Sequence, residues 1–450
     1  MSKPVYERPL LVRHQAGMVN KLSRLLSQPP MTQIDGIPTE ALIERHGSPL
    51  FVFSERTLVL AYRSLHDAFA TRYPKVKIAW SYKTNYLDAI CRVFHREGAR
   101  AEVVSDFEFD KALRLGVPFE QIHFNGPGKS RQVIERALVG GATVHIDHFD
   151  ELALVEEVAR ELDLRPGVAL RLNFGVQGIP SWGRFGFNVE TGQARDAVIR
   201  LLAGDRLGLI GLHCHIGTFI QETEAYRQAA RTMAQFANAI RKEFGITLQF
   251  IDLGGGFASH NTLKEQYLPG EESTPSFARY AEAIVDGLSV LDVPPRELPT
   301  LVLETGRALV DDAGHLLMTV LANKRLPDGR RALVLDGGVN LLFTSNWYKH
   351  DVVPAQPFRG PPEPTVLYGP LCMNIDVLRD TLLCPAMDVG DRLVFCSVGA
   401  YNVTQWMQFI TYRPAVVLIG ADGGEAEIRR RERLEDIVGI EAMPEWLEAN

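Results

Sequence analysis

Short apolar runs alternate with helical patterns between about residue 76 and residue 306. The segments between the runs, such as ELALVEEVARELD, place apolar residues three and four positions apart, as amphipathic helices do. Apolar strands that alternate with helices predict a parallel sheet covered by helices. Eight runs predict strands: KIAWSYK (77–83), AEVVS (101–105), IHFNG (122–126), TVHID (143–147), VALRLN (168–173), GLHCHIG (211–217), QFIDLGGG (249–256) and TLVLE (300–304). Eight such units match a (β/α)8 barrel; a doubly wound open sheet usually has fewer strands and a GxGxxG turn, which we do not find.

The pattern changes after about residue 310, where strands follow one another without long helices between them. The predicted strands are HLLMTVLANKRL, RALVLDGG, PTVLYGPLC, DRLVFCSVGA and MQFITYRPAVVLIG, interrupted by a proline-rich loop over 351–365. We therefore expect an α/β protein with a TIM-like barrel over 49–310 and an all-β domain, a β-barrel or sandwich, over 311–450. Residues 1–48 are expected to form a lead-in that packs on the β domain.

Composition excludes several classes of partner. The chain of 450 residues has a formal charge of −7, whereas a nucleic-acid partner requires a basic face. No apolar run approaches the ~20 residues of a membrane span, and the N-terminus lacks the apolar stretch of a secretory signal. The five cysteines form no CxxC pair. These features predict a soluble, cytoplasmic protein.

Polar residues end each of the eight predicted barrel strands. In this architecture the carboxyl ends of the strands meet at one face, and that face carries the chemistry. Strand ends are often polar simply because they meet solvent, so the residue types have to decide. The residues are Lys83, Ser105, Asn125, Asp147 with His148, Arg171 with Asn173, His215, Gly254, Gly255 and Gly256, and Glu304 with Arg307.

Lys83 ends a strongly apolar strand, and we expect its ammonium to emerge in the barrel mouth with a lowered pKa. The glycines at 254–256 allow backbone amides to approach an anion, and Arg307 is a natural second ligand for a phosphate or carboxylate. A solvated surface lysine and an ordinary glycine-rich loop are the plain alternatives.

A metal site is a competing interpretation of the segment HCHIG. His213 and His215 stand two positions apart, on the same face of a strand, as ligands in barrel hydrolases do. Asp252 and His148 are the only candidates for further ligands. We expect His213 to be a hydrogen-bonded core histidine, and we predict no metal.

Taken together, these segments resemble the fold-type III pyridoxal-phosphate decarboxylases, which include the diaminopimelate, ornithine and arginine decarboxylases. The match runs from about residue 37 to 420, and the diaminopimelate branch is the most similar. Its motifs are SYKTN, VVSDFEFDKAL, RFGFN, GLHCHIGT, DLGGGF, ETGR, GPLC and GAYN, in that order.

The resemblance implies a role for each residue around the cofactor, pyridoxal 5'-phosphate. Lys83 would hold the cofactor as a Schiff base, His215 would stack on its ring, and Glu304 would keep the ring nitrogen protonated. A protonated ring is a strong electron sink, which favours decarboxylation; alanine racemases place an arginine there instead. The remaining cofactor-binding residues are Ser105, Thr218, Gly254, Gly255, Gly256, Arg307 and Tyr401.

The resemblance also implies a homodimer with shared active sites. Cys372 would arrive from the partner subunit as a candidate proton donor; a small buried hydrophobe is its alternative role. The substrate residues are Arg171, Tyr348, Cys372 and Asp376.

The chain departs from the family where diaminopimelate is bound. Met373 occupies the position of the glutamate that binds the distal ammonium group in the family, and Thr344 and Ser345 occupy the positions of an arginine and a proline. Loss of one partner of a buried ion pair costs roughly 3–5 kcal/mol, so meso-diaminopimelate is not the expected substrate. The apolar residues in these segments either repack the core or line a pocket for a larger, less polar group; they are Phe343, Trp347, Trp406, Met407 and Phe409.

We therefore predict a decarboxylase that acts on an amino acid or on an amino-acid-derived biosynthetic intermediate, free or bound to a carrier. Two alternatives remain at this point: a racemase or epimerase that uses the same cofactor, and a non-catalytic protein that binds pyridoxal phosphate or an amino acid.

Overall fold

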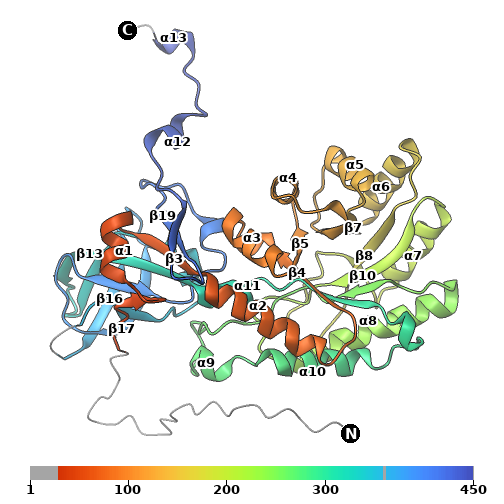
Figure 1. Cartoon of the computed structure of the whole chain (residues 1–450), viewed down its shortest axis with the longest axis horizontal. Helices are drawn as coiled ribbons and strands as arrows, with labels where there is room; N and C mark the ends of the chain where they lie inside the picture. The colour runs from red at the N-terminus through yellow and green to blue at the C-terminus, as the bar shows by residue number, and fades with distance from the viewer. Residues whose placement is uncertain (1–28, 358–360, 449–450) are drawn as a thin grey trace.

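Eight parallel strands close into a barrel in one of the two lobes of the molecule (Figure 1). The computed structural model describes residues 29–357 and 361–448. The barrel closes because β10 pairs with both β11 and β8. Its strands are β4 (Val76–Ser81), β5 (Arg100–Val103), β6 (Ile122–Phe124), β7 (Thr143–Ile146), β8 (Gly167–Asn173), β10 (Gly208–Cys214), β11 (Phe250–Asp252) and β12 (Thr300–Leu303). The predicted (β/α)8 barrel with a C-terminal β domain is confirmed.

Amphipathic helices cover the outer face of the barrel. A helix follows each strand from β4 to β11, and α2, which precedes β4, packs against α3 and α10 and completes the ring. The main helices are α2 (Glu55–Ala70), α3 (Asp88–Arg96), α4 (Asp106–Arg114), α5 (Arg131–Gly140), α6 (Phe149–Glu161), α7 (Gln193–Ala203), α8 (Thr223–Phe244) and α10 (Phe277–Leu288). Short elements at the loops are β9 (Phe187–Asn188), α9 (Gly270–Ser273) and α11 (Arg307–Val310).

The barrel strands are buried on both faces, which explains their continuous apolar sequences. In β4, Ile78 and Ala79 are buried, and Trp80 stacks on Phe94 of α3 with ring centroids 4.1 Å apart. Seven of the eight strands end earlier than the sequence predicts, whereas β8 ends at Asn173 as predicted. As a result, Lys83 lies in a 3-10 turn (Tyr82–Thr84), and the three glycines follow β11 as a turn. These turns project the polar residues beyond the strand ends.

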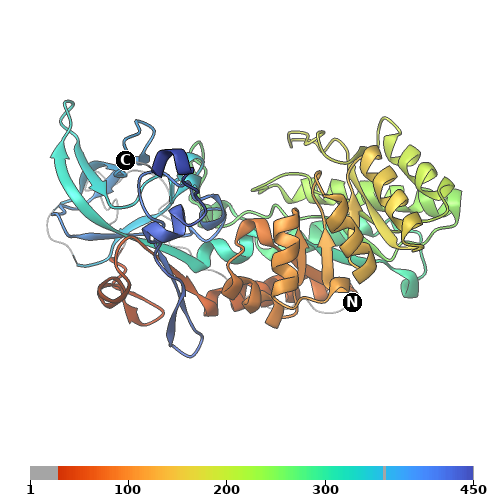
Figure 2. The same ribbon diagram turned by 90° about the horizontal axis from the view of Figure 1, so that it is seen from above.

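The second lobe is built on a sheet that combines both ends of the chain (Figure 2). Its strands are β3 (Leu50–Ser54), β13 (Gly314–Arg325), β14 (Arg331–Leu335), β15 (Val352–Pro354), β16 (Glu363–Tyr368), β17 (Val377–Cys384), β18 (Arg392–Phe395), β19 (Ala415–Ile419) and β20 (Glu425–Arg429). β3 pairs with β13 on one side and with β19 on the other. The domain boundary at residue 49 stays a prediction, although β3, inside the predicted barrel range, belongs to this sheet.

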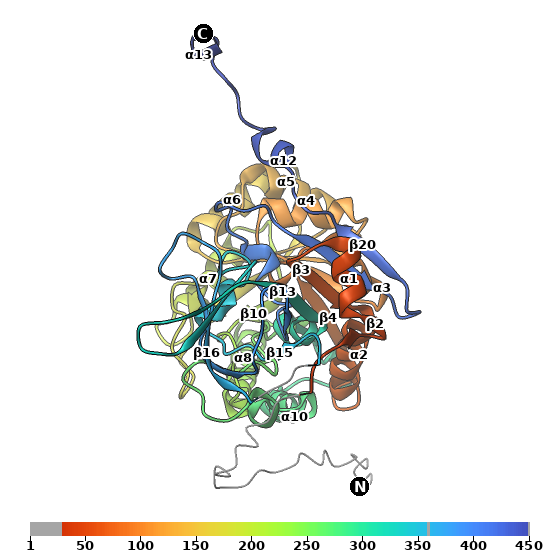
Figure 3. The same cartoon turned by 90° about the vertical axis from the view of Figure 1, so that its left-hand side faces the viewer.

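The two ends of the chain differ from their predicted structures in several places. The part of the lead-in that the structure describes forms β1 (Gln33–Ile34), β2 (Ile37–Pro38) and α1 (Thr39–His46), and Thr39 donates a hydrogen bond to the carbonyl of Ala355 in the β domain. Residues 1–28 lie outside the described residues. The sequence missed β15, which lies in the predicted proline-rich loop, as well as β17 and β20, and residues 407–414 form no strand. Beyond β20, α12 (Leu434–Val438) and α13 (Glu445–Glu448) project away from both lobes (Figure 3).

Among the helices of the described residues, none combines the length and the apolar character that a membrane crossing requires.

Candidate active site

A cavity of about 590 Å³ lies at the carboxyl ends of the barrel strands and is closed on one side by the β domain. Many of the residues predicted for the site line it: Lys83, Arg171, His215, Thr218, Gly256, Glu304, Arg307, Tyr348 and Tyr401. The structure therefore brings these residues together. Other lining residues are Glu102, Asn125, Trp182, Phe185, His213, Phe219, Leu263, Thr344, Trp347 and Gln405.

Lys83 forms an ion pair with Glu102 of β5. Its Nζ lies 2.7 Å from Oε2 and 2.9 Å from Oε1 of Glu102. Burial lowers the pKa of Lys83, but Glu102 and Glu304 outweigh burial and raise it above the ordinary lysine value. The expectation of a lowered pKa is therefore wrong for this structure, because a strand-end sequence does not reveal a carboxylate on the neighbouring strand.

Glu304 follows β12 and is buried at the base of the cavity. The amide of Asn125 donates a hydrogen bond to its Oε1, and Nε2 of His213 lies 3.2 Å from its Oε2. Burial raises the pKa of Glu304, but His213 and Lys83 outweigh burial and lower it well below the ordinary value. Glu304 therefore presents a carboxylate that stays ionised and accepts hydrogen bonds.

Arg307 offers buried donors that have no partner within the chain. Its Nε and Nη1 lack hydrogen-bond partners among the described residues, and the nearest carboxylate oxygen, on Asp311, is 3.6 Å from Nη1. The guanidinium lies over the rings of Tyr348 and Tyr401, each at 4.9 Å from the ring centroid. Buried cationic donors without a protein partner fit a bound anion such as a phosphate.

The glycine turn after β11 leaves space that no side chain could share. A Cβ at Gly256 would lie 2.2 Å from the carbonyl oxygen of Gly217, and at Gly255 it would lie 2.3 Å from that of Glu304. Gly256 lines the cavity together with Thr218, close to Arg307. Backbone so closely packed lets amide groups approach an anion directly. The residues present therefore fit the phosphate of pyridoxal phosphate.

His215 lies in the cavity with a neutral ring. Its Nδ1 accepts a hydrogen bond from the amide of Gly255 at 3.2 Å, which places its proton on Nε2. Burial, with smaller contributions from Lys83 and Arg171, lowers the pKa of His215 to about 3. The ring of Trp182 is 5.3 Å away, so one side of the imidazole is aromatic.

Arg171 on β8 is the one predicted substrate residue that comes from the barrel. Its Nη1 lies 3.6 Å from Oδ1 of Asp147, and its guanidinium is 4.5 Å from the ring centroid of Phe185. The arginine is thus held on the cavity wall by a carboxylate and an aromatic ring.

Several predicted site residues do not line the cavity. Ser105 caps α4, where its hydroxyl accepts a hydrogen bond from the backbone amide of Glu108. Gly254 and Gly255 lie behind Gly256 in the turn, and Cys372 is exposed on the β domain. Asp376 is buried; its carboxylate accepts the backbone amides of Val339 and Leu371. The structure therefore places Asp376 as an anchor between two loops rather than on the wall of its own cavity.

The predicted metal ligands do not assemble as a set. His148 lies at the start of α6, where its Nδ1 accepts the amide of Glu151, and His215 is engaged by the glycine turn. His213 and Asp252 do meet, beside Glu304. His213 is buried as expected, but the expectation that its hydrogen bonds are satisfied is wrong, because neither ring nitrogen has a hydrogen-bond partner among the described residues, although Nε2 lies 3.2 Å from Oε2 of Glu304.

Sequence reasoning missed Glu102 and the aromatic wall. Glu102, the second residue of the apolar run AEVVS, was a usable signal, because a charged side chain in a buried strand is stable only when it has a partner of opposite charge or hydrogen bonds. Trp182 lies in an irregular loop, where the periodicity of the sequence gives no signal.

Comparisons with known proteins agree with this geometry. Residues 61–311 match the family model of the pyridoxal-dependent decarboxylases, pyridoxal binding domain. A diaminopimelate decarboxylase of Bacillus subtilis is 30% identical over 91% of this chain and 94% of its own length. The structure of diaminopimelate decarboxylase from M. jannaschii in co-complex with L-lysine superposes with a TM-score of 0.86, at 29% identity, over 93% of this chain and 98% of that chain. A lysine/ornithine decarboxylase from Vibrio vulnificus, complexed with putrescine, shares the fold, with a TM-score of 0.72 at 22% identity over 86% of this chain and 97% of that chain.

The anchoring position of Asp376 predicts a stability effect. Asp376→Ala leaves two buried amides without an acceptor, so the free energy of unfolding should fall by about 2–4 kcal/mol in urea denaturation. Asp380→Ala, at an exposed position of β17, which begins directly after Asp376, is the matched control and should change the free energy of unfolding by less than about 0.5 kcal/mol. If Asp376→Ala instead kept full stability and lost only turnover, Asp376 would be a substrate residue, as the sequence predicts.

Proposed function

This chain belongs to the pyridoxal-dependent decarboxylases, and we propose that it decarboxylates an amino acid whose distal end is uncharged. It is a carboxy-lyase that uses pyridoxal phosphate, as the sequence predicts. Membership of this family favours neither a racemase nor a non-catalytic binding protein. The observation that carries the proposal is the distribution of charge in the cavity, where both lining acids stand close to Lys83.

When bound, pyridoxal phosphate would supply an electron sink for the α-carbon of the amino acid, which is what loss of the carboxyl group requires. Lys83 would bind the aldehyde group, Glu304 would accept a hydrogen bond from the ring nitrogen, and His215 would pack against the ring. Arg307, Thr218 and the amide of Gly256 would hold the phosphate. These roles are supported by the position of the residues in one cavity.

Glu102 has a role in this scheme that the sequence did not suggest. Lys83 must be neutral before its amine can attack an aldehyde, yet the pair with Glu102 keeps it protonated. Since the two groups are 2.7 Å apart, Glu102 is placed to take that proton from Nζ. We propose that Glu102 exchanges a proton with Lys83 each time the lysine binds or releases the cofactor.

The far wall of the cavity offers no carboxylate to a distal ammonium group. Among the described lining residues, the acids are Glu102 and Glu304, which both engage Lys83 or Asn125. The rest of the wall away from Lys83 is aromatic, aliphatic or neutral: Trp182, Phe185, Leu263, Thr344, Trp347 and Gln405. Burying an unpaired ammonium there would cost several kcal/mol, whereas an apolar group would gain free energy from burial.

Turnover of meso-diaminopimelate is the second candidate, favoured by the names of the relatives. Its distal end carries both an ammonium and a carboxylate. Arg171 is the one arginine outside the phosphate cradle that lines the described cavity, and Asp147 lies close to it. Thr344 lines the cavity with a neutral side chain, which supports the proposal of an uncharged distal group.

Substrate specificity can be measured as CO₂ release from a panel of free amino acids. We expect kcat/KM for an amino acid with an uncharged aromatic or aliphatic end to exceed that for meso-diaminopimelate and L-lysine by about 100-fold or more. Gln405→Glu places an acid on the far wall and should shift the preference toward L-lysine; Gln408→Glu, on an exposed side chain nearby in sequence, is the matched control. Highest kcat/KM for meso-diaminopimelate would contradict the proposal.

Lys83→Ala should remove the absorbance band of the lysine-bound cofactor and reduce CO₂ release to background, because no other amine lies at this position. Lys242→Ala is the control, since Lys242 is exposed in the last turn of α8 and does not line the cavity. An unchanged spectrum in Lys83→Ala would place the cofactor elsewhere.

We also propose a homodimer in which Cys372 completes the site of the partner. Cys372 and Ile375 are exposed on a loop of the β domain and do not line the cavity of their own chain. An exposed cysteine and an exposed large apolar residue on one short loop fit a protein interface.

Mixing two inactive variants tests the shared site. Hybrid dimers of Lys83→Ala and Cys372→Ala contain one intact site each, so the mixture should recover part of the activity that both separate variants lack. Cys396→Ala, at a half-buried cysteine of the same domain, should be active alone. Failure of the mixture to recover activity, with subunit exchange confirmed by mass, would show that Cys372 acts in its own chain or not at all.

A further inference from the structure

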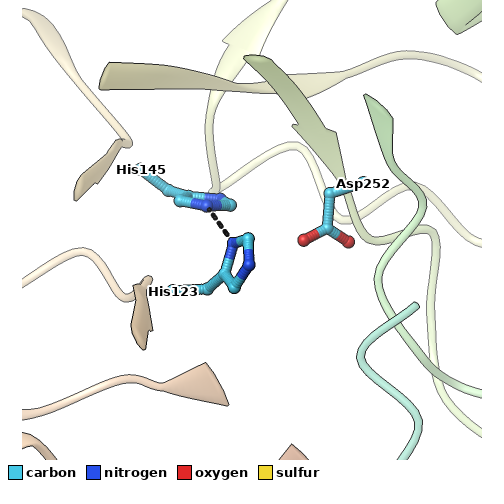
Figure 4. Close-up of side chains that lie close together, drawn as sticks. All are labelled: His123, His145 and Asp252. Carbon is cyan, nitrogen blue, oxygen red and sulfur yellow. Dashed lines mark hydrogen bonds between the residues drawn. The ribbon is translucent and has the colours of Figure 1, made fainter. Parts of the chain in front are cut away.

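A layer of buried histidines and acids lies inside the barrel, where other barrels carry mostly Val, Ile and Leu. It comprises His123 of β6, His145 of β7, His213 of β10 and Asp252 of β11, all almost completely buried. Figure 4 shows three of them, with His123 and His145 in contact and the carboxylate of Asp252 facing them. The proposed roles of the cofactor-binding residues do not use these four side chains.

Arg100 fixes the proton positions on two of the histidines. Its Nη1 lies 3.2 Å from Nε2 of His123, and a guanidinium can only donate. Nε2 of His123 is therefore an acceptor, and the proton of this neutral ring lies on Nδ1. That Nδ1 donates to Nε2 of His145 at 3.2 Å, which leaves the proton of His145 on its own Nδ1. Burial keeps both rings neutral, lowering the pKa of His123 to about 3 and that of His145 well below its usual value.

This direction of donation argues against a metal ion. Ligand atoms of His123, His145 and Asp252 lie within 4.8 Å of one another, a spacing that by itself would suit a cation. A metal ligand needs a free lone pair, and both nitrogens of His123 are engaged. The layer is therefore a hydrogen-bonding network whose polarity is set from Arg100 inward.

The inner end of the network meets Glu304. Nε2 of His213 lies 3.2 Å from Oε2 of Glu304, while Asn125 donates to Oε1. The ring of His145 packs edge-on against that of His213, with centroids 5.2 Å apart. Both carboxylate oxygens of Glu304 are thus contacted from within the barrel, which fixes the plane of the carboxylate.

Asp252 lies beside the same carboxylate. Its Oδ1 accepts the amide of Gly254 at 2.8 Å, and its Oδ2 has no partner among the described residues. Two buried carboxyl groups this close do not both ionise. Burial and Glu304 raise the pKa of Asp252 well above its usual value, so Asp252 holds the proton and Glu304 the charge.

The titratable groups that face Glu304 come from most of the barrel: Lys83, Glu102, His123, His145, His213, His215 and Asp252. Among these groups, His213 contributes most to keeping Glu304 ionised, ahead of Lys83.

We propose that His213 is a positioning residue for Glu304: with protonated Asp252 beside it, it orients the carboxylate and keeps it ionised toward the cofactor ring. The inference rests on the proposed role of Glu304. This role gives the buried layer a function: it keeps Glu304 ionised, with the proton on Asp252 instead, at the pH where the enzyme works. The contacts of Arg100, His123 and His145 hold the ring of His213 in place.

The test compares His213→Leu with His213→Gln in the holoenzyme, because a Gln amide can still place a polar N–H near Oε2 of Glu304, where Nε2 of His213 lies, whereas Leu cannot. Loss of the imidazole beside Oε2 raises the pKa of Glu304, so the charge of Glu304 is lost as pH falls through the new value. We expect the absorbance of the bound cofactor in His213→Leu to gain a titration step that the wild type lacks. We also expect kcat to fall roughly tenfold or more with KM within about twofold. The single variants His213→Gln and Asp252→Asn should each keep the wild-type pH dependence of the cofactor absorbance.

Leu212→Met, a volume-conserving change at the neighbouring buried position of β10, controls for disturbance of the strand. A His213→Leu protein that binds the cofactor with the wild-type pH profile and kcat overturns the inference and leaves the proposed function intact. A wild type that releases CO₂ from no amino acid overturns the proposed function instead. If His213→Leu does not fold, a titration step in His213→Gln that matches no wild-type step would equally overturn the inference.

Discussion

Two carboxylates, Glu102 and Glu304, lie inside a closed barrel, where an unpaired charge would cost several kcal/mol. Each is paired by residues from other strands of the barrel: Lys83, after the adjacent strand β4, pairs with Glu102, whereas Asn125 and His213, from strands across the barrel, contact Glu304. The pairing constrains the whole site, because the lysine and the ring-facing acid can only take up their positions together. The parallel sheet brings these strand ends to one face, and the charges then fix which side chain faces which.

The sequence predicted much of this arrangement for a physical reason. Buried parallel strands have continuous apolar sequences, and their polar ends share one face, so Lys83, His215 and Glu304 could be placed together before the structure was known. Glu102 was missed because it sits within a strand rather than at its end. The pKa of Lys83 was predicted in the wrong direction for the same reason, since its partner lies on the next strand and not near it in sequence.

Other features depend on contacts between distant parts of the chain, which periodicity does not encode. Asp376 carries the charge of a site residue, but its two backbone partners lie on separate loops of the β domain. The aromatic wall at Trp182 comes from an irregular segment. The sequence of β3 is as continuously apolar as that of a barrel strand, yet β3 pairs with strands that lie beyond residue 313. In each case the local sequence fits more than one place in the fold, and only packing distinguishes them.

The position of β3 also orders the events of biosynthesis. Domains near the N-terminus generally fold first as the chain leaves the ribosome. Here β3 emerges before any barrel strand, while both of its neighbours, β13 and β19, emerge after all of them. All strands of the barrel lie between residues 76 and 303, so the barrel can form before the rest of the chain is made. The second sheet can form only after β19, near the end of the chain, has been synthesised. Until then β3, which is wholly buried in the finished protein, has unpaired edges on both sides, and a nascent chain must keep it from pairing elsewhere.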